Sequence, residues 1–309
     1  MENTEMRNGL CPNCGNELNI PAHLEKFACM YCGTVMTPKM LRQKAAAVSS
    51  DRPVNELLKE ACDEFPRSLL DNPDLLKQFN KFDYKSSFEN LCSTYRPVFE
   101  KFEVCFTAEG ADKAEVINAG TDAFIAAVKA DLDSKKSNSR TLDTYRTIIA
   151  LYISPMIKSF GYSIGDAFAL ALCDKWIEAY PKFIYRVGTY EDLAAGFRKK
   201  FKLCFLTTAV CEHSGKPDDC YELQTLRAFR DGYLASSENG EELISEYYSI
   251  APGIVTCIDV CGEGDTVYPM IREKYINPCI ADIENGRMES CRSRYITMVN
   301  ELRNRYLPQ

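Results

Sequence analysis

The chain has 309 residues, 46% of them hydrophobic, a length and composition that suggest about two domains with a sizeable core. Its net charge of −7 disfavours nucleic-acid binding, because proteins that bind phosphate backbones usually carry a clear basic excess. The fifteen cysteines and the polar start without a signal segment favour a reducing cytoplasm, and the apolar stretches are too short for a membrane span of about 20 residues.

Two cysteine pairs lie close to the N-terminus. Cys11 and Cys14 form one C-x2-C pair, and Cys29 and Cys32 form the other. This spacing is typical of a structural zinc site, and the segment between the pairs is long enough for a short β-hairpin that closes the tetrahedron. Because four sulfur ligands leave no open coordination position, we expect one structural Zn²⁺ ion without a catalytic role.

Residues 1–40 are therefore predicted to form a zinc ribbon, in which the metal supplies folding free energy on the order of 10 kcal/mol. The segment resembles the zinc ribbons of transcription initiation factors, and also those of many proteins with unrelated roles. His23 lies between the two cysteine pairs. We interpret it as a solvent-facing loop residue, with metal ligation as the alternative.

Residues 41–53 are predicted to form a short helix and a linker, and residues 54–199 a helical middle domain. Proline, glycine and polar stretches divide this domain into candidate helices at about 54–64, 73–81, 84–102, 110–132, 140–160, 163–180 and 189–202. The clearest helical periodicity is an apolar stripe of Tyr145, Ile148, Ile149, Tyr152, Ile153, Met156, Ile157 and Phe160. A stripe this wide belongs in the interior of a helical bundle.

Residues 200–309 are predicted to form a helical C-terminal domain. Its first helix places Cys204 and Cys211 on one face, and Gly215 and Pro217 break it.

The next helix of this domain is expected to run to Leu234. Asp218 or Asp219 is suited to cap its start, because a carboxylate can accept hydrogen bonds from unpaired backbone N–H groups. Arg227 and Asp231 are spaced as an i, i+4 ion pair on this helix.

Further helices are predicted towards the C-terminus. Residues 241–250 form one, and Pro252 is expected to start a separate short helix. Residues 265–307 resemble a helical hairpin that bends at Asn285 and Gly286.

Several strings in this region match a known family. CFLTTAVC, KPDDC and LRAFRDGYL resemble the CFI-box C-terminal domain, including its variant with CYITTAVC and KPDDC. The strings EYYSIAPGIV, KYINPCI and YITMVNELRNRYL extend the similarity over roughly residues 200–309. The resemblance implies a helical C-terminal module that is often joined to unrelated N-terminal domains, zinc ribbons among them. It implies no particular reaction.

The C-terminal cysteines are the candidates for thiol chemistry. Cys204 follows the basic residues Lys200 and Lys202, which favour a thiolate nucleophile, and His213 is the candidate base. We favour the alternative that these cysteines are small buried hydrophobic residues, because they recur at helical spacing among apolar neighbours. A second metal site is the weakest interpretation, since it would have to combine Cys204, Cys211, Cys220, Cys257 and Cys261 without a further C-x2-C pair.

A group of charged residues offers a second candidate site. It consists of Asp218, Asp219, Arg227, Arg230 and Asp231. We favour a structural role in which arginine–aspartate bonds fix how two helices meet. The alternative is a pocket in which the arginines bind an anionic ligand.

The sequence thus predicts a mostly α protein, a multi-helix bundle with a small N-terminal four-cysteine zinc ribbon. Because the phosphate-binding and hydrolase motifs are absent from the sequence, we expect a binding or regulatory module that recognises another protein. Two alternatives stay open: a cysteine enzyme centred on Cys204, and nucleic-acid binding through the ribbon.

Overall fold

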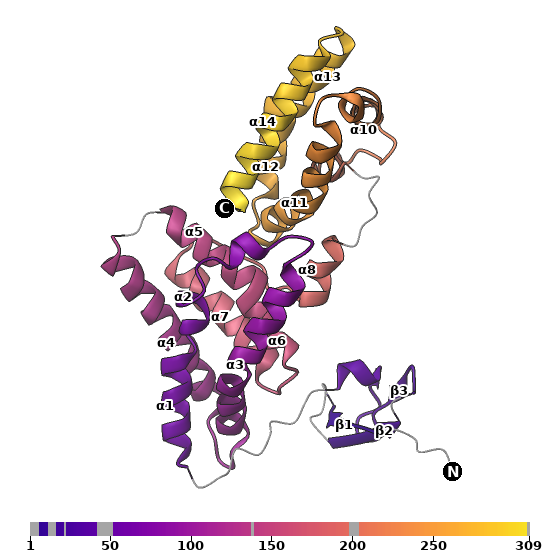
Figure 1. Ribbon diagram of the computed structural model, residues 1–309. Helices are drawn as coiled ribbons and strands as arrows, with labels where there is room; N and C mark the ends of the chain where they lie inside the picture. The colour runs from indigo at the N-terminus through magenta and orange to yellow at the C-terminus, as the bar shows by residue number, and fades with distance from the viewer. Residues whose placement is uncertain are drawn as a thin grey trace. The chain divides into compact units, whose positions relative to one another are not determined.

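The computed structural model describes residues 6–11, 17–21, 23–41, 52–136, 139–197 and 204–307. Within these ranges the chain is mostly helical, with small antiparallel strand pairs near the N-terminus (Figure 1). The predicted mostly α fold is therefore confirmed. None of the described helices combines the length and the apolar character needed to cross a membrane.

The N-terminal segment contains two β-hairpins. Strand β1 (Met6–Leu10) pairs with β2 (Glu17–Pro21), and β3 (Phe27–Ala28) pairs with β4 (Val35–Met36). Each cysteine pair thus falls in the connection between two paired strands, whereas the sequence suggested one hairpin between the pairs. In the second pair, residues 29–33 make the connection as a tight turn, which Gly33 completes with a φ of +74°.

A single 3-10 turn, η1 (Pro38–Met40), follows the second hairpin. Of residues 41–53, which are predicted to form a short helix and a linker, residues 42–51 lie outside the described residues.

The chain divides into two compact units. The first contains residues 1–72, 89–142 and 152–182, and the second contains residues 73–88, 143–151 and 183–309. Each unit is assembled from segments that are distant in the sequence. The domain boundaries predicted near residues 53 and 199 stay a prediction.

The first unit packs its helices around phenylalanine rings. The ring centroid of Phe65 lies 4.7 Å from that of Phe124 and 5.4 Å from that of Phe168, and all three side chains are fully buried. Such contacts add to the free energy gained by burying the rings. The helices are α1 (Val54–Glu64), α2 (Arg67–Leu70), most of α3 (Tyr84–Thr107), α4 (Lys113–Ser134), the start of α5 (Ser139–Ile148), α6 (Ser154–Ser159) and α7 (Gly165–Ala179).

A buried carboxylate joins α3 to α7. Glu103 is 1% exposed and accepts hydrogen bonds from the backbone N–H groups of Ser163 (2.9 Å) and Ile164 (3.0 Å). These groups lie just before α7 begins at Gly165, where backbone donors have no partner within the helix. Glu103 therefore satisfies donors at the start of α7.

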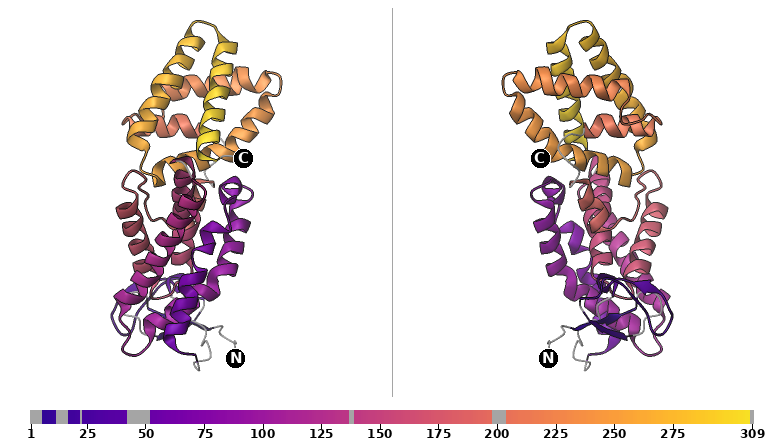
Figure 2. Two further views of the ribbon diagram at one scale, coloured as in Figure 1. Left: turned by 90° about the vertical axis from the view of Figure 1, so that its left-hand side faces the viewer. Right: turned by 90° about the vertical axis from the view of Figure 1, so that its right-hand side faces the viewer.

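The second unit contains the C-terminal helices. Helices α13 and α14 form the hairpin expected from the sequence, with Gly286 at a φ of +71° in its bend (Figure 2). The elements are η2 (Leu75–Gln78), α8 (Tyr190–Gly196), α9 (Phe205–His213), α10 (Tyr221–Phe229), η4 (Arg230–Leu234), α11 (Gly240–Val260), α12 (Gly264–Ile271), η5 (Arg272–Ile276), α13 (Asn277–Glu284) and α14 (Met288–Tyr306).

The predicted apolar stripe from Tyr145 to Phe160 is confirmed as buried. It runs along α5, the π-helical segment η3 (Ile149–Ile153) and α6.

A buried arginine of α5 belongs to a polar network with residues at the start of α12 and the end of α14 in the second unit. Arg146 is 3% exposed and forms ion pairs with Asp143 and, at 2.6 Å, with Glu263. Glu263 also accepts a hydrogen bond of 2.6 Å from the hydroxyl group of Tyr306. Burial opposes the ionisation of Glu263, but the bonds from Arg146 and Tyr306 outweigh it and hold the pKa of Glu263 below its usual value.

Two expected helices differ from the structure. The helix predicted at 73–81 is only the 3-10 segment η2, because Pro73 and the bonds of Asn80 to Phe82 and Asp83 favour turns. Pro252 does not start a new helix but lies inside α11. The cost of a proline there is offset by the burial of neighbours such as Ile254.

The phenylalanine cluster makes Gly120→Ala a test of packing in the first unit. Alanine normally favours a helix over glycine, but here the added Cβ would lie 2.7 Å from Cζ of Phe168 and 2.8 Å from the ring of Phe102. We expect destabilisation of about 1–3 kcal/mol, measured as a lower thermal midpoint. In the control Gly188→Ala the added methyl group meets only Leu193 at 3.7 Å, so the midpoint should not change. A midpoint of Gly120→Ala at or above the wild-type value would contradict this packing.

Candidate metal centre

Three cysteines of the N-terminal segment converge on one point. Cys11 follows β1 directly, Cys29 follows β3, and Cys32 lies in the turn that leads to β4. Their sulfur atoms all lie within 4.8 Å of one another, and the Cys11 and Cys32 sulfurs are 3.7 Å apart. Cys14, the fourth predicted ligand, lies outside the described residues.

Hydrogen bonds in the turn between β3 and β4 favour binding of a cation by the cysteine sulfurs of this turn. The N–H of Gly33 donates to the carbonyl oxygen of Cys29 at 2.8 Å, and the N–H of Cys29 donates to the carbonyl oxygen of Thr34 at 2.9 Å. Burial raises the pKa of the Cys29 thiol to about 11, whereas the backbone N–H groups of Tyr31 and Cys32 act in the opposite direction. N–H groups directed at sulfur stabilise a thiolate, which is the form that binds a metal.

The spacing of the sulfurs fits a tetrahedral ion. Two sulfurs bonded to such an ion at about 2.3 Å lie about 3.8 Å apart, close to the 3.7 Å between Cys11 and Cys32. The cluster can therefore hold a metal ion. The side chain of His23 is exposed and is not part of the cluster, as the loop interpretation expected.

Elsewhere in the described chain, no second group of three metal-ligating side chains converges in this way. The thiols of Cys211 and Cys220 do contact each other, and burial together with this contact raises the pKa of Cys211 to about 12. The carboxylate of Glu222 interacts with Cys220, but the ligating atoms of these three residues do not all converge as those of the N-terminal cluster do.

Cys204 lies in a buried polar cluster of the second unit. It is 2% exposed, and its sulfur accepts a hydrogen bond of 3.4 Å from Nη1 of Arg230, which also donates to the hydroxyl of Tyr248 at 2.7 Å. Burial raises the pKa of Cys204 above its usual value, although Arg230 and Arg227 act in the opposite direction. The basic residues Lys200 and Lys202, expected to activate this thiol, lie outside the described residues.

His213 is not brought to Cys204. Cys204 precedes α9 and His213 ends it, so the helix rise separates them by about 13 Å. The imidazole Nε2 instead lies 3.6 Å from the carboxylate of Asp265, and its ring packs against Tyr268. The structure therefore offers Cys204 no base from His213.

The predicted charged group forms two separate ion pairs. Arg227 donates to the carboxylate of Asp218 at 2.7 Å and to its carbonyl oxygen at 2.8 Å. Arg230 binds Asp231 through two bonds of 2.7 and 3.0 Å. The expected Arg227–Asp231 pair is thus wrong, because regular α-helix ends at Phe229 and the π-helical segment η4 changes the spacing.

The expected aspartate cap is also wrong. The residue at the start of α10 is Cys220, whose side chain makes no capping hydrogen bond. The carbonyl oxygen of Asp219 accepts a hydrogen bond of 2.8 Å from the side-chain amide of Gln224. Asp218 is used by Arg227 instead, so these residues join the loop after α9 to α10.

The sequence interpretation missed two groups of residues. The hydroxyl of Thr34 lies 3.2 Å from the sulfur of Cys32, and the hydroxyl of Tyr248 accepts a hydrogen bond from Arg230. Met30 and Tyr31 are exposed at the tip of the second cysteine pair. Their position between Cys29 and Cys32 was a visible signal, since large apolar residues are unusual choices for an exposed turn.

No family model matches the chain, and neither a curated protein nor a solved structure matches it. The resemblance to the CFI-box C-terminal domain therefore stays a prediction.

The sulfur cluster predicts how the protein binds metal. Purified protein should carry one equivalent of a divalent ion, and Cys29→Ser or Cys32→Ser should reduce it to near zero, because three ligands no longer close the site. Elemental analysis measures the stoichiometry, with Cys92→Ser, a half-buried cysteine outside the cluster, as the matched control. Full metal content in Cys29→Ser would rule out the cluster as the site. Cys14→Ser tests the predicted fourth ligand in the same way.

The burial of Cys204 predicts slow modification. With iodoacetamide at pH 7, the half-buried Cys220 should be labelled before Cys204, because Cys204 is nearly inaccessible and burial raises its pKa. Peptide mass spectrometry over a time course measures the order, and labelling in denaturant shows that both thiols can react. Faster labelling of Cys204 in the native protein would instead support the cysteine-enzyme alternative.

Proposed function

We propose that the protein is a recognition module whose metal-clamped N-terminal ribbon docks on another protein. The observation that supports it is the exposure of three large apolar side chains around the second cysteine pair. Met30 is 76% exposed, Val35 66% and Tyr31 60%. Next to Val35 on the same strand, Met36 is buried in the core of the ribbon, whereas Val35 itself is exposed.

The pairing of β3 with β4 explains how these residues form one surface. Ala28 and Val35 are direct partners, so their side chains share one face of the hairpin, and both are exposed. Phe27 and Met36 are the neighbouring partners and point to the other face, where Met36 is buried. Met30 and Tyr31 are exposed in the turn that joins β3 to β4. We call Ala28, Met30, Tyr31 and Val35 the ribbon tip.

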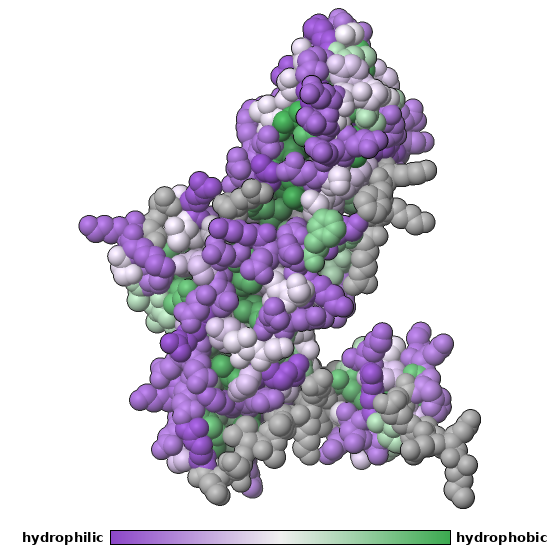
Figure 3. Space-filling view, viewed as in Figure 1, coloured by the Kyte–Doolittle hydropathy of each residue, from purple (hydrophilic) through white to green (hydrophobic). Residues whose placement is uncertain are grey.

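The ribbon tip has the chemistry of a protein interface. Tyrosine and methionine are enriched in such interfaces, whereas lysine and glutamate are depleted. The described part of the ribbon is nearly neutral, with basic residues Arg7, Lys26 and Lys39 against acidic residues Glu17 and Glu25. Binding to nucleic acid would require a basic surface. On the face shown in Figure 3, apolar residues lie among hydrophilic ones on this segment.

We propose that the ion bound by the sulfur cluster is Zn²⁺. Sulfur ligands in tetrahedral arrangement select zinc or iron, and zinc is the usual ion of C-x2-C ribbons. The ion would be held by Cys11, Cys29 and Cys32 with Cys14 as the fourth ligand, and it would stabilise the ribbon without a catalytic role. The thiols must stay reduced to bind it, which fits a cytoplasmic protein.

We propose that the helical part of the chain serves as a scaffold for the ribbon. The strings shared with the CFI-box C-terminal domain support a module of that family at residues 200–309. The burial of Cys204 and its separation from His213 support a binding role over a cysteine-dependent reaction.

Site-specific photocrosslinking tests the proposal. The photoreactive amino acid p-benzoylphenylalanine replaces Tyr31 in the full chain, expressed in the organism that encodes it. We expect one protein to be crosslinked at position 31 in near-stoichiometric amount, because the ribbon tip is the docking surface. Gel shift and mass spectrometry identify the adduct.

The matched control places the same amino acid at Phe82, which is 75% exposed and distant in the sequence. Adding Met30→Ser or Cys29→Ser should abolish the crosslink at position 31, since the first removes apolar contact and the second removes a metal ligand. The same adducts at positions 31 and 82 would contradict docking by the ribbon tip. Adducts to RNA or DNA would favour the nucleic-acid alternative.

A further inference from the structure

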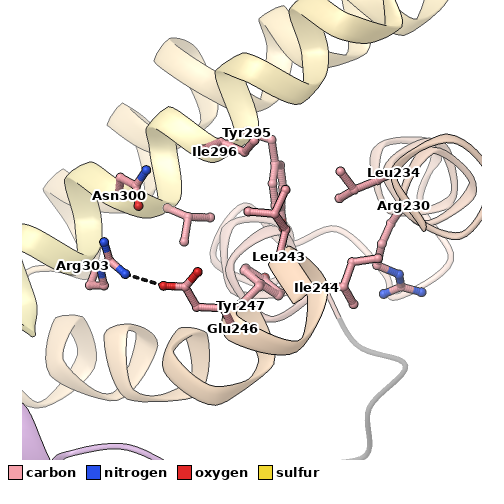
Figure 4. Close-up of a pocket in the computed structure, with 11 residues that line it drawn as sticks. Arg230, Leu234, Leu243, Ile244, Glu246, Tyr247, Tyr295, Ile296, Asn300 and Arg303 are labelled. Atoms are coloured by element: carbon pink, nitrogen blue, oxygen red, sulfur yellow. Dashed lines mark hydrogen bonds and ion pairs between the residues drawn. The ribbon is translucent and has the colours of Figure 1, made fainter. Parts of the chain in front are cut away.

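A small cavity lies within the second unit, between α11, α14 and the π-helical segment η4 (Figure 4). Its volume is about 130 Å³. Half-buried aliphatic side chains make most of its wall, and tyrosine rings complete it. The apolar lining includes Leu234, Leu243, Ile244, Tyr247, Ile296 and Val299.

The volume and the lining residues of the cavity determine which molecules can bind in it. An apolar cavity of about 150 Å³ engineered into another protein stays dry and binds benzene, so a cavity of 130 Å³ has room for one aromatic ring. Leu243, Ile244, Ile296 and Val299 retain apolar surface that a ligand would remove from water. We propose that this cavity binds a small, neutral, apolar molecule about the size of a single aromatic ring.

The charges around the cavity favour a neutral ligand. Arg303 forms an ion pair with Glu246 across one side of the cavity (Figure 4). The guanidinium group of Arg230 is held by Asp231 at 2.7 Å and by the hydroxyl of Tyr248 at 2.7 Å, so that only its stem faces the apolar wall. Each charged side chain among the described lining residues thus has an opposite charge beside it. A ligand with its own charge would have to be desolvated without gaining a partner.

The backbone of η4 gives an independent reason to regard the cavity as a binding site. Arg230 and Leu234 are the first and last residues of this π-helical segment, and both line the cavity. Short π-helical insertions are rare and occur frequently at functional sites, because the additional residue redirects side chains. Here the insertion contributes one wall of the cavity. A Cβ added at Gly232, in the centre of η4, would have no other atom within 4 Å. Replacing Gly232 would therefore cause no steric clash.

Methyl NMR of the full chain, titrated with toluene and then with indole, tests the proposal. We expect saturable shifts of the methyl groups of Leu243, Ile244, Ile296 and Val299, with a Kd of about 1 mM or tighter for one of the two probes. Benzoate and benzylamine, which add a negative or a positive charge to the ring, should bind at least about tenfold more weakly. Shifts that do not saturate, or a charged analogue that binds more tightly than toluene, would overturn the proposal.

Cavity-filling variants provide the control. Val299→Phe should weaken binding of the neutral probe at least about tenfold, because the new ring occupies the cavity. Met270→Phe makes the same kind of change on α12 outside the cavity and should bind as the wild type does. Leu243→Phe serves as a second filling variant if Val299→Phe lacks native helical circular dichroism. Wild-type affinity in a folded filling variant would show that the probe binds elsewhere and overturn the proposal.

Discussion

The convergence of three sulfurs is the constraint on which the N-terminal ribbon depends. Among the described residues, the buried core of this segment consists of Cys11, Leu18, Ile20, Cys29 and Met36, and two of these five side chains belong to the sulfur cluster. Three apolar side chains bury too little surface to offset the entropy lost when the segment is ordered. Metal ligation would supply the difference and would also fix the turn between β3 and β4. Metal ligation by Cys29 and Cys32 would also hold Met30 and Tyr31, which lie between them, in their exposed positions.

The helical units are stabilised in a different way. They bury many aromatic and aliphatic side chains, and the buried charged groups of Glu103, Arg146 and Asp282 each have hydrogen-bond or ion-pair partners. Arg146 shows this clearly, because it neutralises Asp143 and Glu263 at a point where α5, α12 and α14 meet. Removing Arg146 would leave two carboxylates close together without their shared, buried cation, which destabilises the fold. The small cavity beside η4 stands out against this close packing, and its apolar wall is the reason to regard it as a binding site.

Patterns with strict local periodicity could be predicted from the sequence. Spacing and backbone freedom alone account for the convergence of Cys11 with Cys29 and Cys32, for the buried stripe from Tyr145 to Phe160 and for the bend at Gly286. The partners of Arg227 could not be predicted, because they depend on where α10 changes to a π-helical segment. Pro252 was misinterpreted for a similar reason: burial along α11 overrides a local preference. The distance between Cys204 and His213 also becomes apparent only once both are placed on one helix.

The central claim is that metal ligation holds the ribbon tip in its exposed arrangement. Methyl and amide NMR of the full chain during titration with a chelator tests it most directly, with far-UV circular dichroism recorded in parallel. The account predicts that the dispersed signals of Met30, Tyr31 and Val35 collapse as the metal is removed, while the helical signal stays unchanged. Unchanged signals from these residues after elemental analysis shows complete metal loss would contradict it.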